Sequence, residues 1–491
     1  MHPKTNAQSY RHFLETPIGD LLAPTDIDQQ LTSLHQQAAD KVPAYADFLN
    51  QHGHNSAISN RCEFSQLPLT TKDNYIRAYP LAQRCPNGRL DQCEMIAVSS
   101  GSTGEPLFWP RSIKHELEIA TRFEQVLHDS FKAHERSTLV IVCFALGNWV
   151  GGIYTANCIR LVAQKNYPIT LVTPGSNPDE IFRIVRELSP HFDQTIFAGY
   201  PPFIKGLLDR GRSQDIDWPQ YNLRFIFAGE VFSEEWRQLL MEYCCSDNIY
   251  HDSASLYGTA DAGVLGNETP LSIRIRRFFA DKPSAARQVF GESRLPALMQ
   301  YDPSSRYFET HNDTLVVSGD NGVPLLRYHI ADKGGIFSYD ELIKAVNDLG
   351  GNINVCGEDS THRKLPFVYL FGRADFTTSY FGANIYPENI SIALEQAPIN
   401  TWVSGKFVLQ STEDEALDTK LKLAIELLPQ ITADKVDIKL LSSTVIQQLQ
   451  RLNSEFKAYV PLAQQKIDVT LWSHEHPDYF PTGVKHRYTR G

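Results

Sequence analysis

Four apolar segments in the middle of the chain alternate with segments of helical pattern, and this alternation constrains the fold more than any other feature. Strands that are apolar on both faces are typical of a parallel sheet with helices on both sides, and ligands of such sheets bind at the carboxyl ends of the strands. The apolar segments are 137–146, 167–174, 194–200 and 223–230, and the helical patterns that follow them are 150–166, 178–188, 202–212 and 232–245.

The rest of the chain has different patterns. Residues 1–90 are irregular and partly helical, and the apolar residues of 112–131 recur every three to four positions, which predicts one helix. Beyond about residue 300, the segments 314–319 and 325–332 indicate a β-rich subdomain. Near the end, 421–427 alternates strictly, which predicts a strand, and a polar helix is expected near 433–456.

The predicted fold class is therefore α/β. We expect a large N-terminal domain, residues 1–373, with mostly parallel sheets covered by helices plus the β-rich subdomain. A small α+β C-terminal domain, residues 374–491, should follow it. A chain of 491 residues exceeds one ordinary core, which agrees with two domains.

Composition and charge argue against several classes of protein. The net charge is −11 and no basic block occurs, so the signature of a nucleic-acid-binding protein is missing. No run approaches the roughly 18 apolar residues of a membrane span, and the first residues lack the apolar stretch of a signal peptide. The eight cysteines are interpreted as reduced thiols. A cytoplasmic enzyme without a nucleic-acid or membrane partner is the expectation.

The strongest local signal is a loop rich in glycine and hydroxyl residues that follows a short apolar segment. Its glycines allow a tight turn, and its N–H groups and hydroxyls could hold phosphate oxygens. It is not the GxxxxGK[ST] loop, and from composition alone a plain surface loop is the alternative. The candidate phosphate-binding residues are Ser99, Ser100, Gly101, Ser102, Thr103 and Gly104, followed by Glu105 and Pro106.

The loop and six later segments together resemble the adenylate-forming superfamily, which includes acyl-CoA synthetases and nonribosomal adenylation domains. The resemblance covers about 95–491, and its details are most similar to phenylacetate–CoA ligases. The later segments, in the family's order, are the Gly-Glu adenine contact AGE (228–230), the Tyr-Gly-x-Thr-Glu match YGTAD (257–261), the Arg-Tyr-x-Thr-Gly-Asp match RYHIAD (327–332), the hinge GRAD (372–375), the following GANIYPE (382–388) and the ending PTGVK (481–485).

The resemblance implies that ATP binds to specific residues of these segments. Asp332 would accept hydrogen bonds from the ribose hydroxyls, and Arg373 would pair with the ribose or with Asp332. The alternatives are a turn residue for Asp332, a surface ion pair for Arg373 and a core position for the tyrosine that would face the adenine ring. The implied adenine contacts are Gly229, Glu230, Tyr257 and Gly258.

The resemblance also implies a magnesium ligand, a catalytic lysine and a hinge. Asp261 stands where the family has a magnesium-binding glutamate, and its shorter side chain would need a closer backbone or a bridging water; a helix-capping role is the alternative. Lys485 would stabilise charge that develops at the α-phosphate, with Arg487 and Lys466 as fallback candidates. Asp375 would be the hinge about which a mobile C-terminal domain rotates between two half-reactions.

The sequence departs from the family pattern at four positions. Ala260 replaces a hydroxyl residue, Ile330 a threonine and Ala331 a glycine, and Leu107 stands where many members have lysine. The changes leave the phosphate and metal contacts open. Because the ribose carboxylate, the hinge and the terminal lysine remain, we expect an active enzyme, and a non-catalytic nucleotide-binding homologue is the alternative from another class.

The sequence says less about which acid is the substrate and which thiol accepts the acyl group. Trp149, Tyr154 and Tyr200 could line an acyl pocket, and core aromatics are the alternative. His251 and Asp252 are adjacent, but no Gly-x-Ser-x-Gly elbow accompanies them, which argues against a hydrolase. The expected activity is ATP- and magnesium-dependent activation of a small carboxylic acid to acyl-AMP, followed by transfer to coenzyme A. The phosphopantetheine arm of a carrier protein is the alternative acceptor.

Overall fold

The computed structural model describes the chain from residue 3 to residue 489 with several gaps. The described ranges are 3–54, 57–99, 107–147, 150–292, 294–352, 362–373, 378–381, 383–413, 419–481, 486 and 488–489. Within these ranges, no helix has the length and apolar character needed to cross a membrane.

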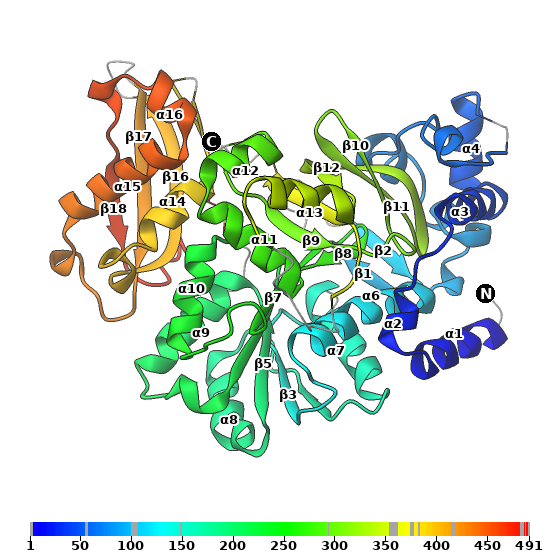
Figure 1. Cartoon of the computed structure of the whole chain (residues 1–491), viewed down its shortest axis with the longest axis horizontal. Helices are drawn as coiled ribbons and strands as arrows, with labels where there is room; N and C mark the ends of the chain where they lie inside the picture. The colour runs from blue at the N-terminus through cyan, green and yellow to red at the C-terminus, as the bar shows by residue number, and fades with distance from the viewer. Residues whose placement is uncertain are drawn as a thin grey trace.

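One large twisted sheet runs through most of the molecule (Figure 1). Among the described residues it has eleven strands in the order β10-β11-β12-β13-β9-β8-β7-β6-β5-β3-β4. The bounds are β3 Thr138–Val142, β4 Ile169–Val172, β5 Gln194–Gly199, β6 Leu223–Ala228, β7 Ser253–Thr259, β8 Gly263–Asn267, β9 Ala297–Gln300, β10 Tyr307–His311, β11 Thr314–Asn321, β12 Val323–Phe337 and β13 Phe367–Arg373.

The sheet changes character at β7. From β4 to β7 neighbouring strands are parallel, as the alternation of apolar and helical segments predicts. From β7 to β10 every neighbouring pair is antiparallel. The predicted β-rich segments, which form β11 and β12, therefore continue the same sheet. They are joined to it because β12 pairs with β13 and β13 pairs with β9.

Helices cover both faces of the parallel half. Val140 packs into one core with α6 and α7, while its neighbours Leu139 and Ile141 pack into another with α8, α9 and α10. Successive residues of a strand point to opposite faces, so a strand between two helical layers must be apolar throughout. These helices are α6 Ile113–Gln125, α7 Val150–Ala163, α8 Pro178–Leu188, α9 Pro201–Arg212 and α10 Glu234–Tyr243.

Other helices lie over the antiparallel half and at the N-terminal end of the chain. The N-terminal helices lie at the end of the molecule away from the C-terminal residues (Figure 1). Helices α3, α4 and α5 pack on the β10–β12 side, whereas α1 and α2 contact α6. Their bounds are α1 Pro3–Glu15, α2 Ile18–Leu21, α3 Ile27–Lys41, α4 Pro43–Gln51 and α5 Arg61–Phe64, and those over the sheet are α11 Pro270–Ala280, α12 Pro283–Phe290 and α13 Tyr339–Asp348. A separate hairpin pairs β1 Met95–Val98 with β2 Phe108–Arg111.

The C-terminal residues build a small α+β unit with a core of its own. The buried apolar residues of its main core lie between Tyr380 and Ile467, and a smaller cluster adds Phe480. This unit, called the small domain below, lies at the α9–α10–α12 end of the large one (Figure 1). Its elements are β14 Thr378–Tyr380, β15 Ala383–Ile385, α14 Pro387–Leu394, β16 Val403–Glu413, β17 Thr419–Leu427, α15 Ile438–Leu452, α16 Ser454–Tyr459 and β18 Asp468–Trp472.

The predicted fold class is confirmed: a large α/β part is followed by a small α+β part. The predicted helix near 433–456 is two helices, α15 and α16, because Asn453 ends the first and caps the second. The predicted boundary at 373/374 lies at the end of β13, beside residues 374–377, which are outside the described residues. The boundary stays a prediction.

Helix α9 offers a matched pair of glycines that tests the packing on one face of the sheet. A methyl group at Gly211 would lie 2.0 Å from the buried ring of Trp218, whereas one at Gly206 would meet nothing within 4 Å. We expect Gly211→Ala to destabilise the protein by about 1–3 kcal/mol, because it overpacks a filled core. Gly206→Ala should instead stabilise it by about 0.5–1 kcal/mol, since alanine favours a helix. Urea denaturation measures both; equal effects would contradict the packing.

Candidate active site

The predicted ligand-binding residues gather at the carboxyl edge of the parallel strands. Tyr200 follows β5, Glu230 follows β6, and Tyr257 lies near the end of β7. Asp332 comes from the antiparallel half, where it pairs with Arg373 across β12 and β13. The structure thus brings together residues from four distant segments, as expected for a site at the end of a parallel sheet.

Two buried carboxylates at this edge are held by a reciprocal pair of hydrogen bonds. The phenol of Tyr257 on β7 donates to Asp332 on β12 over 2.6 Å. The phenol of Tyr328 on β12 donates to Asp261, just after β7, over 2.6 Å. Burial and the charge of Asp332 raise the pKa of Tyr257 well above its ordinary value, so this phenol stays a donor. Each aspartate is therefore fixed by a tyrosine from the opposite strand.

Lys72, which none of the sequence motifs indicates, lies beside Asp261. Its ammonium is 3.2 Å from the Asp261 carboxylate. It begins a helical turn, Lys72–Ile76, with a capping box in which Thr71 and Asn74 bond to each other's backbone. Thr70, two residues before Lys72, is joined to β12 by backbone hydrogen bonds with Arg327 and His329. The capping pattern could have predicted the turn, but only the tertiary contact reveals its position.

A buried arginine fixes the backbone next to Asp261. Arg111 is 1% exposed, and its guanidinium donates to the carbonyls of Ala260 and Asp261, the latter over 3.0 Å. Arg111 ends β2, the second strand of the hairpin that carries the predicted phosphate loop. The loop hairpin and the segment after β7 are therefore linked directly.

The two ends of the predicted phosphate loop are joined. Ser99 N–H donates to the Leu107 carbonyl over 3.0 Å, and Leu107 N–H donates to the Ser99 hydroxyl over 2.9 Å. These two bonds extend the pairing of β1 and β2 by one residue on each strand. Ser100, Gly101, Ser102, Thr103 and Gly104 lie outside the described residues.

Glu230 lies beside two tyrosines. The phenol of Tyr200, after β5, donates a hydrogen bond to its carboxylate, and Tyr488, near the end of the chain, lines the same pocket as Glu230. Gly229 before it has a left-handed backbone, with φ 95°, and a Cβ there would lie 3.5 Å from the Tyr200 ring. Only glycine adopts this conformation without strain, so Gly229 allows the turn that brings Glu230 to the Tyr200 phenol.

Tyr154, predicted for the acyl pocket, packs in the core between α6, α7 and the sheet. It is 3% exposed, and its phenol lies 3.4 Å from the Nδ1 atom of His115. Burial and the nearby Arg111 hold the pKa of His115 well below its ordinary value, so the imidazole is neutral. Trp149 lies outside the described residues, and an acyl pocket formed by these aromatics stays a prediction.

Other predicted residues also lie outside the described part of the chain. These are Lys485, Asp375 and the fallback Arg487. Gly258 lies in β7, where a Cβ would meet the Gly263 carbonyl at 3.0 Å. For Arg373, only the backbone pairing with Asp332 is described. Lys466, the other fallback, is in the small domain after α16.

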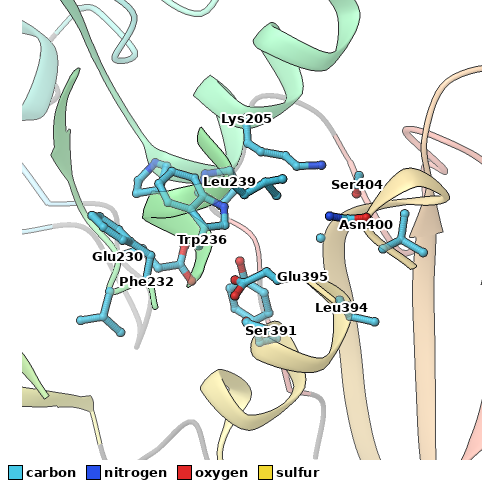
Figure 2. Close-up of a pocket in the computed structure, with 16 residues that line it drawn as sticks. Lys205, Glu230, Phe232, Trp236, Leu239, Ser391, Leu394, Glu395, Asn400 and Ser404 are labelled. Atoms are coloured by element: carbon cyan, nitrogen blue, oxygen red, sulfur yellow. The ribbon is translucent and has the colours of Figure 1, made fainter. Parts of the chain in front are cut away.

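A pocket opens between the large and small domains, next to Glu230 (Figure 2). One wall comes from α9 and α10 with Lys205 and Trp236, and the other from α14 and β16 with Glu395 and Ser404. Ser233, the N-cap of α10, accepts from Trp236 N–H over 2.9 Å and donates to Glu395 over 2.5 Å. One hydroxyl therefore both caps a helix and joins the two domains.

The comparisons with known proteins bear on the fold. No family model matches the sequence, and no curated protein matches it. The solved structure of 2-hydroxyisobutyryl-CoA ligase in the postadenylation state, in complex with R3-HIB-AMP, has a TM-score of 0.68 at 16% identity, covering 94% of this chain and 88% of that one. The same ligase in the thioesterification state, with 2-HIB-AMP and CoA, has a TM-score of 0.54 at 15% identity, covering 98% and 91%.

The chain has the fold of these CoA ligases. The shared fold includes the large α/β part and the small C-terminal part, since the aligned region covers nearly the whole of both chains. At 16% identity the likeness concerns the fold, and the chemistry of this chain has to be argued from its own residues. The finer resemblance to phenylacetate–CoA ligases stays a prediction.

The Glu395 carboxyl at the domain interface predicts a pH dependence of stability. Burial, with the neighbouring Glu235, raises the pKa of Glu395 to about 8, while Ser233, Lys205 and Arg276 act in the opposite direction. The folded state therefore binds this proton more tightly than the unfolded state does. The free energy of unfolding should fall as the pH rises from the ordinary glutamate pKa of 4.5 to about 8, and level off above it.

Glu395→Gln should remove this part of the pH dependence, because the amide is neutral throughout. Thermal unfolding of wild type and variant across this range measures the slope. Glu242→Gln, an exposed glutamate on α10, is the matched control and should keep the wild-type slope. Parallel pH profiles for wild type and Glu395→Gln would show that the interface carboxyl is solvated and ionised.

Proposed function

We propose that this protein activates a carboxylic acid with ATP and passes the acyl group to a thiol. In the first step a carboxylate oxygen attacks the α-phosphorus of ATP, which forms acyl-AMP and releases pyrophosphate. In the second step a thiolate attacks the acyl carbon and AMP leaves. The observation that carries the proposal is the pair of tyrosine-held aspartates at the carboxyl edge of a fold shared with CoA ligases.

The nucleotide half of the site follows from these residues. Asp332, which Tyr257 holds in place by a hydrogen bond, would accept hydrogen bonds from the two ribose hydroxyls. A carboxylate in a fixed orientation suits this role. Arg373 would pair with the ribose or with Asp332, and Glu230 and Tyr257 would contact the adenine. The phosphates would lie towards the loop 99–104, where Lys72 adds a positive charge beside Asp261. This charge would compensate for Leu107, which stands where many members of the superfamily have lysine.

Magnesium would reach the site with ATP. Within the described ranges no three His, Cys, Asp or Glu side chains cluster to hold a metal. Magnesium bound to a nucleotide takes most of its ligands from phosphates and water and needs one or two carboxylates. Asp261 fits that role, with Tyr328 fixing its orientation. The bound ion would supply charge neutralisation on the phosphates.

Coenzyme A is the proposed thiol, and this rests on the CoA present in the complexes of 2-hydroxyisobutyryl-CoA ligase. The phosphopantetheine arm of a carrier protein would use the same chemistry and remains the alternative acceptor. A non-catalytic nucleotide-binding homologue would bind ATP without turnover. Exchange of labelled pyrophosphate into ATP, across a panel of aryl, aliphatic, hydroxy and amino acids with magnesium, separates an adenylating enzyme from such a homologue. One class of acid should support exchange; ATP binding without exchange for any acid would contradict the proposal.

Asp332→Asn should weaken ATP binding while leaving the fold intact. The amide oxygen still accepts the Tyr257 hydrogen bond, but the charge that strengthens the ribose bonds is lost. Hydrogen bonds to charged groups contribute about 1.5–3 kcal/mol, so we expect a roughly tenfold to hundredfold rise in Kd for ATP. Isothermal titration measures it, with Asp340→Asn on α13 as the control. Unchanged affinity would mean that Asp332 serves only the strand pairing.

Lys485 and Asp375 should separate the two half-reactions. Lys485→Ala should slow acyl-AMP formation by about 10²-fold or more, through lost transition-state stabilisation, and still convert supplied acyl-AMP to thioester. Asp375→Pro should do the reverse, because proline fixes φ and stiffens a hinge. Pyrophosphate exchange and thioester mass spectrometry are compared side by side. Equal loss of both steps in both variants would overturn the assignment.

A further inference from the structure

A buried arginine holds the loop that follows β6. This loop, residues 229–233 between β6 and α10, is called the β6 loop below. Arg276 on α11 donates from Nη2 to the Phe232 carbonyl and from Nη1 to Glu234, each over 2.5 Å. Its Nε atom donates to the Pro296 carbonyl, just before β9, over 2.9 Å. One guanidinium therefore fixes the β6 loop to α10, to α11 and to the segment that leads into β9.

A second buried arginine extends these contacts to β7. Arg237 on α10 donates to Glu234 over 3.0 Å and to Glu268, just after β8, over 2.6 Å. It also donates to the Ser253 hydroxyl at the start of β7 over 2.6 Å. Glu268 in turn accepts a hydrogen bond from the Ser255 N–H of β7 over 2.9 Å. A chain of charged hydrogen bonds thus runs from the β6 loop to β7.

The charged groups of this network are buried together in the large domain. The four, each at most 5% exposed, are Glu234, Arg237, Glu268 and Arg276. Burial acts to raise the pKa of Glu234, but Arg237 and Arg276 outweigh it, and the pKa lies below its ordinary value. Arg277 approaches the same carboxylate from the partly exposed side, over 3.7 Å. Glu234 is therefore ionised at neutral pH and accepts strong, charge-assisted hydrogen bonds.

Stability alone does not explain such a network. Replacing a buried ion pair with apolar residues of similar volume is often neutral or stabilising, because each charge loses its hydration on burial. What the network adds is direction, since a guanidinium presents its donors in a rigid plane. The segments that it joins are the β6 loop, which carries Glu230, and β7, which carries Tyr257. These two residues are the proposed adenine contacts.

We propose that Arg276 is a positioning residue of the ATP site: through the Phe232 carbonyl and Glu234 it holds the β6 loop, and with it Glu230, at the distance from Tyr257 that an adenine ring needs. The inference rests on the proposed function above. Adenine lies away from the α-phosphorus where the reaction takes place. A displaced β6 loop should therefore weaken ATP binding more than it slows the reaction of bound ATP.

The double variant Arg276→Met with Glu234→Met tests this without leaving an unpaired charge. It keeps Arg237 paired with Glu268, so the protein should fold, which urea denaturation checks. Because the Phe232 carbonyl loses its donor, the Kd for ATP in isothermal titration should rise about tenfold. Pyrophosphate exchange at saturating ATP should change by less than about threefold. Should the double variant not fold, Arg276→Lys, which keeps the charge without the planar fork, should show the same split between affinity and rate.

A buried ion pair on the other side of the sheet gives the matched control. Lys165 and Glu124 lie 2.7 Å apart, and their side chains are 6% and 1% exposed. Lys165→Met with Glu124→Met removes this pair and should leave the Kd for ATP unchanged. An equal rise in the Kd for the two double variants would show a general effect of lost ion pairs and would overturn the positioning role.

Hydrogen–deuterium exchange of the backbone keeps the proposal testable whatever the activity. Amides of 229–236 should exchange about tenfold faster in the Arg276 variant than in wild type, and at the wild-type rate in the control variant. Wild-type protection of these amides, or faster exchange with an unchanged Kd for ATP, would overturn the proposal. If wild type bound no ATP while these amides lost protection in the variant, the proposed function would fail and the hold of Arg276 on the β6 loop would stand.

Discussion

The two hydrogen bonds from Tyr257 to Asp332 and from Tyr328 to Asp261 set the shape of the sheet around the proposed site. They join β7 to β12, which is four strands away in the sheet order. In a flat sheet these strands would be about 19 Å apart, four steps of about 4.8 Å, which is beyond the reach of a tyrosine and an aspartate. The 2.6 Å bonds therefore require the sheet to curl, and the irregular pairing of β12 with its neighbours provides local bending.

This curl brings the remaining groups of the site into one place. It carries Asp332 over the ends of the parallel strands, where Glu230 and Tyr257 already lie. It also lets the N-terminal segment, bonded to β12 through Thr70, present Lys72 to Asp261. The small domain then contacts the large one through Glu395, which accepts a hydrogen bond from Ser233. The account thus links sheet geometry, nucleotide binding and domain position through a few polar contacts.

The sequence predicted the parallel half well because apolar runs between helical patterns leave few other solutions. It did not predict that β12 continues the same sheet, since strand order beyond local hairpins depends on long-range pairing. Alternation would put Tyr328, Ile330 and Asp332 on one face, but left-handed backbone at Arg327, φ 46°, and at Ala331, φ 63°, interrupts it. At Ala331 the family pattern has glycine, the residue that adopts this conformation without strain. Lys72 was missed because its role exists only through a tertiary contact.

The central claim is that a carboxylate oxygen of the acid attacks the α-phosphorus of ATP, and isotope transfer tests it most directly. An acid that supports pyrophosphate exchange is labelled with ¹⁸O in both carboxylate oxygens and incubated with the protein, ATP, magnesium and coenzyme A. Mass spectrometry of the released nucleotide then locates the label. The account predicts AMP that carries one ¹⁸O from the acid. Unlabelled AMP, or release of ADP with the label in inorganic phosphate, would contradict it.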